Sequence, residues 1–251
     1  MPLSGTEQGR AQLEMGAGGD RTVEVDRVAE SAVLSELDAL AARGERFSVL
    51  SEEVGSRSFG ADYPLVVVDP VDGSLNAKQG IPFFNVMLAL LDGPTIADVA
   101  VGSVLNMVSG ESWSAVRGEG ARRNGERMVA LPPMQRGHIE LLGLESSPRS
   151  LKVAAPLIER ASKVRILGSM ALSMAHTASG ALDVFCAPLP MRVFDMAASL
   201  RILAESGGVA TDVGGGSLDA LECDLSTRTT LLCSADGGLH AVALRTLAGS
   251  R

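Results

Sequence analysis

One short stretch constrains this chain more than any other, an apolar run that ends in two acidic residues three positions apart. Residues 66–76 read VVVDPVDGSLN. A β-branched run of this kind predicts a buried strand. The proline after Asp69 suits the second position of a type I turn, which brings the first and fourth residues within about 7 Å of each other. We therefore expect the carboxylates of Asp69 and Asp72 to converge where a buried strand ends.

Two carboxylates at that separation repel each other. At roughly 4 Å and an effective dielectric constant near 20, the repulsion is about 4 kcal/mol, and protonation, separation or a cation relieves it. Carboxylate oxygens, the carbonyl of Val71 and water are ligands that magnesium prefers. Gly73 and Ser74 follow at an expected helix N-terminus, where free amides attract an anion. The segment thus predicts adjoining cation and phosphate sites, as metal-assisted phosphate ester hydrolysis requires.

An ordinary turn is the alternative interpretation, since Asp-Pro and Asp-Gly are common turn dipeptides. Two further acidic sites favour the metal site. Ser51, Glu52 and Glu53 end an apolar run upstream, and Asp195 follows the segment MRVF, where it could also simply cap the next helix.

Composition narrows the class of protein. A chain of 251 residues with 46% hydrophobic content can bury a substantial core. The 30 acidic and 22 basic residues give a net charge of −8, which disfavours nucleic acid as a partner. The most apolar segment, residues 81–91, is too short and interrupted to span a membrane. We expect a cytoplasmic protein that binds neither nucleic acid nor membrane.

The cysteines and histidines exclude other kinds of metal site. Cys186, Cys223 and Cys233 show no C-x-x-C spacing, and the three histidines are scattered along the chain. We expect reduced, buried thiols and, for any metal, a hard ion bound by oxygen.

Hydrophobic spacing predicts a mixed, layered α/β architecture without separable modules. Helices are expected from Asp26 to before Gly44, at 170–179 and at 196–206, and Asn124-Gly125 predicts a tight hairpin turn. Strands are expected at 47–53, 65–69, 84–91, 98–106, 181–187, 209–213 and 230–235.

Five blocks carry a resemblance to a known group of enzymes. They are SEEVG at 51–55, VVVDPVDGSLNAKQGIPFF at 66–84, VRGEGARRNG at 116–125, RILGSMALSMAHTASGALDVF at 165–185 and MRVFDMAASLRILAESGG at 191–208. In this order they resemble the lithium-sensitive, magnesium-dependent phosphatase superfamily of inositol monophosphatases and fructose-1,6-bisphosphatases, in particular its archaeal-type and bacterial branch. The resemblance implies a layered α-β-α-β-α sandwich in a single phosphatase domain over 1–251. An N-terminal α+β half would cover about 1–135 and a C-terminal α/β half about 136–251.

The resemblance also implies roles for individual residues. The metal ligands would be Glu52, Asp69, the carbonyl of Val71, Asp72 and Asp195, with Glu53 behind them. They would hold two or three Mg²⁺ ions, which Mn²⁺ could replace and Li⁺ would inhibit. Asp26, Ser74 and Glu52 would be catalytic, since Asp26 and Ser74 would orient and deprotonate a metal-activated water that attacks phosphorus directly. Substrate contacts would come from Asp72, Gly73, Ser74, Arg165, Gly168, Ser169, Met170 and Arg192.

Two departures from the family pattern bear on this assignment. The segment before Asp195, residues 186–194, lacks the glutamate with which animal inositol monophosphatases grip the inositol ring, and Arg192 instead resembles enzymes that often accept both inositol phosphate and fructose 1,6-bisphosphate. The spacing from Asp20 to Asp26 is kept, but the family's early threonine or lysine has no clear counterpart. For Arg165 and Arg192, a structural ion pair is the competing interpretation.

The expected function is hydrolysis of inositol monophosphate, fructose 1,6-bisphosphate or both, by a homodimer. Two alternatives within the superfamily are 3′-phosphoadenosine 5′-phosphate and histidinol phosphate as substrates, and the aromatic content of 3% argues against stacking a purine. An alternative from another class is a catalytically silent regulatory protein that binds phosphate and magnesium.

Overall fold

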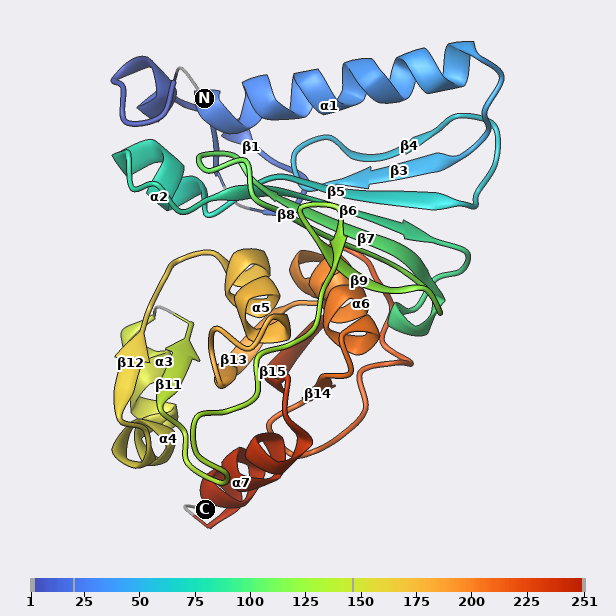
Figure 1. Cartoon of the computed structure of the whole chain (residues 1–251). Helices are drawn as coiled ribbons and strands as arrows, with labels where there is room; N and C mark the ends of the chain where they lie inside the picture. Colours follow the sequence, from blue (N-terminus) through green and yellow to red (C-terminus); the bar gives the residue numbers. More distant parts are fainter. Residues whose placement is uncertain (1–2, 20, 146, 250–251) are drawn as a thin grey trace.

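Helices and sheets alternate in five layers in the computed structural model of this chain, which describes residues 3–19, 21–145 and 147–249 (Figure 1). Helix α1 covers the outer face of a large sheet, and α5 and α6 lie between that sheet and a smaller one. Helices α3, α4 and α7 lie beyond the small sheet. This arrangement confirms the predicted α-β-α-β-α sandwich. The helices are α1 (Glu24–Ala42), α2 (Ser74–Gln79), α3 (Pro148–Val153), α4 (Ala155–Arg160), α5 (Met170–Ala178), α6 (Ala197–Glu205) and α7 (Gly237–Ala248), with 3₁₀ turns η1 (Gln8–Arg10), η2 (Ile96–Asp98) and η3 (Phe194–Met196).

The large sheet has eight strands in the order β10-β9-β8-β7-β6-β5-β3-β4, and a separate hairpin, β1-β2, precedes it in the chain. Its neighbouring strands are antiparallel except for β3 and β5, which run parallel. The strands are β1 (Gln12–Met15), β2 (Arg21–Val23), β3 (Ser48–Ser51), β4 (Gly55–Ser58), β5 (Leu65–Asp72), β6 (Asn85–Leu91), β7 (Val99–Asn106), β8 (Ser112–Val116), β9 (Gly120–Arg123) and β10 (Glu126–Arg127).

The small sheet has five strands in the order β12-β11-β13-β15-β14. Strand β11 runs parallel to both its neighbours, whereas β15 is antiparallel to both of its own. The strands are β11 (Leu141–Leu144), β12 (Lys163–Arg165), β13 (Val184–Arg192), β14 (Val209–Thr211) and β15 (Arg228–Ser234).

The largest core cluster fills the space between the two sheets. Met87 and Trp113 of the large sheet belong to it together with Met174 of α5, Ile202 of α6 and Leu231 of the small sheet, and all five side chains are fully buried. Each such side chain contributes roughly 1.5–3 kcal/mol relative to exposure. This packing fixes the position of one sheet against the other.

Local predictions are confirmed at the first helix and at the hairpin. Helix α1 ends before Gly44, whose φ of +97° no ordinary helical residue adopts. Asn124 and Gly125 have φ of +52° and +81° between β9 and β10, as a tight turn with two left-handed residues requires. The three cysteines are buried and reduced. Within the described residues, no helix is both long and apolar enough to cross a membrane.

Three boundaries differ from the prediction. Strand β5 does not turn at Asp69 but continues to Asp72, with an irregular pairing in which Asp69 faces Met87 and Asp72 faces Asn85. Three steps along β5 therefore match two along β6, which is a bulge with one extra residue. Strand β13 extends past residue 187 to Arg192, also with an irregular register.

The third difference concerns Asp195, which does not cap a helix. It lies in the 3₁₀ turn η3, and α6 begins after Met196 without a side-chain cap. The carboxylate of Asp195 instead accepts a hydrogen bond from Arg192.

Candidate active site

Three acidic side chains from distant parts of the chain meet between the two sheets. Glu52 follows β3, Asp69 lies in β5, and Asp195 lies in η3 just after β13. One carboxylate oxygen from each lies within 4.8 Å of the others. Asp69 is 3% exposed and Asp195 is 8% exposed. The fold thus concentrates negative charge where water screens it poorly.

This environment raises the pKa of both aspartates. Burial is the main reason that the pKa of Asp69 lies well above its ordinary value, and the charges of Glu52, Asp72 and Asp195 raise it further. Burial also raises the pKa of Asp195 to about 7, although Arg192 opposes the change. In the absence of an added cation, Asp195 therefore retains its proton to near neutral pH, and Asp69 shifts in the same direction.

Arg192 lies directly against two members of the cluster. Its Nε donates to Oδ2 of Asp195 at 3.0 Å, and its Nη2 lies 2.5 Å from Oε1 of Glu52. Burial alone would lower the pKa of the guanidinium, but the two carboxylates raise it. A Cβ on Gly18 would lie 2.5 Å from Nη1 of Arg192, so the absence of a side chain at Gly18 makes room for the arginine. This ion pair is the structural alternative considered above, and a contact of Arg192 with substrate stays a prediction.

The donor set fits a hard divalent cation. Carboxylate oxygens make up the cluster, and Oδ1 of Asp195 is buried without a hydrogen-bond partner among the described residues. A buried carboxylate oxygen without a partner carries a desolvation cost that a coordinated ion removes. Oxygen ligands of this kind suit magnesium or calcium better than softer transition metals.

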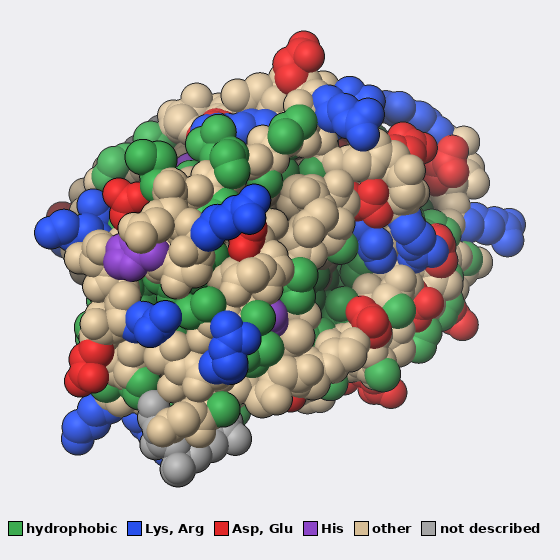
Figure 2. All heavy atoms as spheres, turned by 60° about the horizontal axis from the view of Figure 1, so that its bottom comes forward, with side chains coloured by type: hydrophobic (Ala, Val, Ile, Leu, Met, Phe, Trp, Pro, Cys, Tyr) green, Lys and Arg blue, Asp and Glu red, His purple; other side chains and the backbone are tan. Residues whose placement is uncertain are grey.

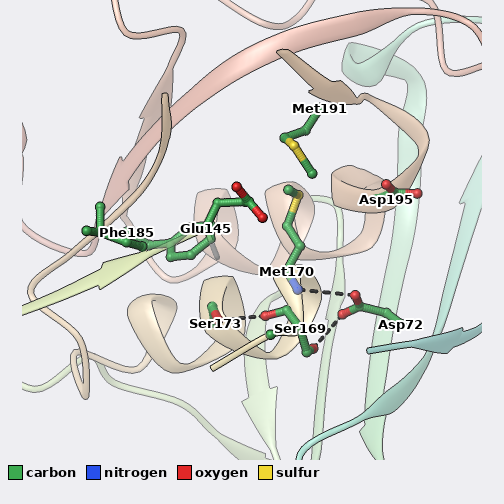
Figure 3. Close-up of a pocket in the computed structure, with 10 residues that line it drawn as sticks. Asp72, Glu145, Ser169, Met170, Ser173, Phe185, Met191 and Asp195 are labelled. Carbon is green, nitrogen blue, oxygen red and sulfur yellow. Dashed lines mark hydrogen bonds between the residues drawn. The ribbon is translucent and has the colours of Figure 1, made fainter. Parts of the chain in front are cut away.

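Asp72 lies beside the cluster rather than in it. Its Oδ2 accepts hydrogen bonds from Asn85 Nδ2 at 2.7 Å, Ser169 Oγ at 2.5 Å and the amide of Ala171 at 2.8 Å. Its Oδ1 accepts from the amide of Met170 at 3.1 Å (Figure 3). Asp72 therefore ties the end of β5 to the first turn of α5, and its role as a metal ligand stays a prediction.

Asp26 and Ser74, the expected water-activating pair, come from different helices and lie close together. Asp26 is 4% exposed near the start of α1. Burial raises its pKa, and the amide of Val23 and the hydroxyl of Ser74 partly oppose that rise. Ser74 also donates to the carbonyl of Val71 at 2.8 Å, so this carbonyl points toward the same region.

Two glycines allow the chain to pass closely at the expected phosphate position. Gly73 has a φ of +92°, and a Cβ there would lie 3.1 Å from the carbonyl oxygen of Phe83 and 3.3 Å from that of Gly168. Gly168 has a φ of +76° and faces Asn76 in the same way. Ser169 then caps α5, accepting from the amide of Leu172 at 3.3 Å. The segments 73–74 and 168–170 therefore lie side by side, as the substrate-contact prediction assumed.

A pocket of about 130 Å³ opens beside these residues (Figure 3). An engineered cavity of about 150 Å³ holds one benzene ring, so this pocket has room for a group about the size of a single six-membered ring. Arg165 lies elsewhere, in a separate hollow with Glu140, Lys163 and Asp183. The pocket is lined by Asp72, Leu144, Glu145, Gly168, Ser169, Met170, Ser173, Phe185, Met191 and Asp195.

Sequence reasoning missed two polar residues of the site. The hydroxyl of Thr22 donates to Oε2 of Glu53 in a short hydrogen bond, while burial raises the pKa of Glu53 to about 7. Thr22 lies four residues before Asp26, one position earlier than the family pattern places its threonine, so spacing did not single it out. Glu145 directly follows β11 and lines the pocket, but nothing in its local sequence indicated this. Asp20 lies outside the described residues.

Comparisons with known proteins agree with this geometry. The model of the inositol monophosphatase family matches residues 5–249. A fructose-1,6-bisphosphatase/inositol-1-monophosphatase of Methanothermobacter thermautotrophicus is 33% identical over 98% of this chain and 90% of its own length. A bifunctional NADP phosphatase/NAD kinase of Methanococcus maripaludis is 28% identical over 93% of this chain, which spans 44% of that longer protein. Among solved structures, an IMPase of Thermotoga maritima superposes with a TM-score of 0.77 and 27% identity, over 96% of this chain and 89% of its own.

The layered fold, the buried acidic cluster and these matches define a phosphoric monoester hydrolase. The cluster is the place where such an enzyme would bind its metal. The chain belongs to the inositol monophosphatase family.

Proposed function

We propose that the protein hydrolyses the phosphate monoester of a small sugar or cyclitol, such as inositol 1-phosphate or fructose 1,6-bisphosphate, with magnesium as the metal. The observation that carries the proposal is the convergence of Glu52, Asp69 and Asp195 within 4.8 Å beside a pocket of about 130 Å³. The pocket has room for a single ring beside the phosphate, and NADP phosphatases among the relatives make NADP the compound to compare.

One set of residues would hold the metal ions, and a second set would act on the attacking water. Glu52, Asp69 and Asp195 would hold two or three Mg²⁺ ions, with Asp72 and the carbonyl of Val71 completing the ligand set. When bound, the ions would offset the charge of the phosphate, lower the pKa of water and stabilise the leaving alkoxide. Mn²⁺ would substitute, and Li⁺ would inhibit.

Asp26 and Ser74 would act on the attacking water. Burial raises the pKa of Asp26, which makes its carboxylate a stronger base than an exposed one. The adjacent hydroxyl of Ser74 would orient this carboxylate toward the water. Water would attack phosphorus directly, its proton would pass to Asp26, and no phosphorylated enzyme would form. Backbone amides of Gly73 and Ser74 would hold the phosphate oxygens during this step.

A panel of substrates tests the proposal. Phosphate release is measured from inositol 1-phosphate, fructose 1,6-bisphosphate, histidinol phosphate, 3′-phosphoadenosine 5′-phosphate and NADP, with Mg²⁺ and with EDTA. We expect turnover of the sugar or cyclitol esters that requires Mg²⁺. Asp69→Asn should abolish it, whereas Asp38→Asn, at an exposed ion pair with Arg57, should not. No turnover on any compound by folded protein would favour the silent regulatory alternative.

A further inference from the structure

The pocket beside the acidic cluster carries a negative charge at its far end. Its ten lining residues include three acids, Asp72, Glu145 and Asp195, and no lysine, arginine or histidine is among those described. In Figure 3, Glu145 lies on one side of Met170, and Asp72 and Asp195 lie on the other. Glu145 therefore faces the part of a substrate that is remote from the metal.

The carboxylate of Glu145 is held in place by the first turn of α3 and its N-cap residue. Its Oε2 accepts from the amide of Ser147 at 3.0 Å and from Oγ of the buried Ser150 at 2.6 Å. Its own amide donates to the carbonyl of Cys186 at 3.1 Å. These bonds fix the side chain before any ligand arrives, so its charge is preorganised.

Apolar neighbours strengthen the effect of this charge. Leu144, Phe185 and Met191 line the pocket beside Glu145. Such surroundings lower the local dielectric constant and leave fewer waters to screen a fixed carboxylate. A ligand group that enters here meets an acceptor of hydrogen bonds and a repulsive field for anions.

We propose that Glu145 determines which phosphate esters the enzyme accepts. It favours alcohols that present hydroxyl or ammonium donors at this end of the pocket, and it lowers kcat/KM for esters that carry a second phosphate there. The inference rests on the proposed function, because it assumes that the first phosphate lies at the acidic cluster. Two charges about 6 Å apart, at an effective dielectric constant of about 40, change an equilibrium by roughly tenfold.

A purely structural role for Glu145 predicts a different result. The bonds to Ser147 and Ser150 could exist only to shape the start of α3, and their loss would then weaken all substrates equally. Glu145→Gln separates the two roles, since glutamine keeps an oxygen acceptor and nearly the same volume but removes the charge. Glu140→Gln is the matched control, because it removes the same charge from an exposed glutamate outside the pocket.

The first measurement is the ratio of kcat/KM for inositol 1-phosphate to kcat/KM for fructose 1,6-bisphosphate in Mg²⁺. We expect the wild-type ratio to favour the monophosphate and to fall at least tenfold in Glu145→Gln, while Glu140→Gln leaves it within twofold. A ratio in Glu145→Gln that stays within twofold of wild type would overturn the proposal. Histidinol phosphate, which has an ammonium but no free hydroxyl, identifies the donor: a larger loss for it than for inositol 1-phosphate in Glu145→Gln assigns an ammonium, and a smaller loss assigns hydroxyls.

The second measurement does not depend on turnover. Titration calorimetry of the same two esters, with Ca²⁺ in place of Mg²⁺, gives the ratio of their Kd values in each variant. A tenfold shift of this ratio in Glu145→Gln without turnover in any protein would sustain the selectivity and defeat the proposed hydrolysis. Turnover in Mg²⁺ with both ratios unchanged in Glu145→Gln would sustain the proposed hydrolysis and defeat the selectivity.

Discussion

The guanidinium of Arg192 donates through Nε to the buried carboxylate of Asp195 at 3.0 Å, three residues along the chain. The same guanidinium reaches Glu52, so one arginine contacts two of the three acids at the centre of the site and partly offsets their charge. A metal ion that binds there competes with a positive charge that the protein already supplies. The arginine should therefore stabilise the metal-free protein more than the metal-bound one.

Arg192→Met tests this relationship. Removing one partner of a buried ion pair costs about 3–5 kcal/mol, because the other charge is left uncompensated. We expect a loss of this order in the free energy of unfolding in EDTA and a clearly smaller loss in saturating Mg²⁺, measured by urea denaturation. Arg57→Met is the control: its pair with Asp38 is 46% and 50% exposed, and it should cost no more than about 1 kcal/mol in either condition. Equal losses with and without Mg²⁺ for Arg192→Met would contradict the prediction.

The raised pKa values predict an unusual pH dependence of stability in EDTA. In the unfolded chain an aspartate deprotonates near its ordinary pKa, about 3.9, whereas Asp195 in the folded protein does so at about 7. Between these values the folded state binds more protons than the unfolded state, so Asp195 makes stability fall as pH rises. Asp69, whose pKa is also raised, acts in the same direction.

Chemical denaturation at intervals from pH 4 to 8 measures this effect. We expect Asp195 to lower the free energy of unfolding by about 1.4 kcal/mol for each unit by which its folded pKa exceeds its unfolded one, once the pH is above both. Mg²⁺ should flatten the profile, since it binds the charged carboxylates. Stability that rises steadily from pH 4 to 7 in EDTA, in both wild type and Asp195→Asn, would show that these acids titrate normally.

Asp72→Asn should abolish turnover while the protein still folds. The carboxylate accepts hydrogen bonds through both oxygens, whereas asparagine would place an NH₂ group opposite donors from α5. A buried polar mismatch of this kind costs about 1–3 kcal/mol, which an intact domain tolerates. The far-ultraviolet circular dichroism spectrum should be unchanged and the melting temperature lowered by a few degrees. Activity near the wild-type level in Asp72→Asn would show that Asp72 is not required for catalysis.

Gly73→Ala should reduce turnover far more than stability accounts for. Its positive φ disfavours a side chain, and a Cβ would press on the carbonyl of Phe83 at 3.1 Å. Gly110→Ala is a matched control, because Gly110 has a φ of +75° in open space between β7 and β8. Both variants should lose about 1–2 kcal/mol of stability from backbone strain, and Gly73→Ala should lose more because its Cβ also meets the carbonyl of Phe83. Only Gly73→Ala should lower kcat by tenfold or more; equal kcat in the two variants would argue against a role of this backbone at the phosphate.

Local patterns in the sequence predicted the alternating helices and strands, and the family resemblance predicted the acids of the site. Hydrophobic patterns identified α1 and the strands around Asp69, and the Asn124-Gly125 dipeptide identified the hairpin, because each depends on neighbouring residues. The family motifs placed Glu52, Asp69 and Asp195 in one site, and the fold brings them together.

Other features depend on contacts between distant segments, and these could not be read from the chain. The bulge in β5 arises from its register with β6, which a turn propensity at Pro70 does not contain. The cap interpretation of Asp195 was wrong for a local reason, because its carboxylate accepts a hydrogen bond from Arg192 and not from an amide of α6. Glu145 reaches the pocket only because β11 and β13 lie side by side in the small sheet. Acidic and basic side chains are interspersed on the face of the molecule that Figure 2 shows, a distribution that net charge alone does not specify.

The three acids reach their meeting point from both sheets, with Glu52 and Asp69 on one and Asp195 beyond a strand of the other. A nascent chain that has completed only the first sheet therefore holds two of the three, and a molecule in which the sheets have separated holds the site in pieces. An ion bound by acids from both sides of this junction would hold the two sheets together. Loss of the ion and separation of the two sheets should then promote each other, so that the protein loses activity before it unfolds completely.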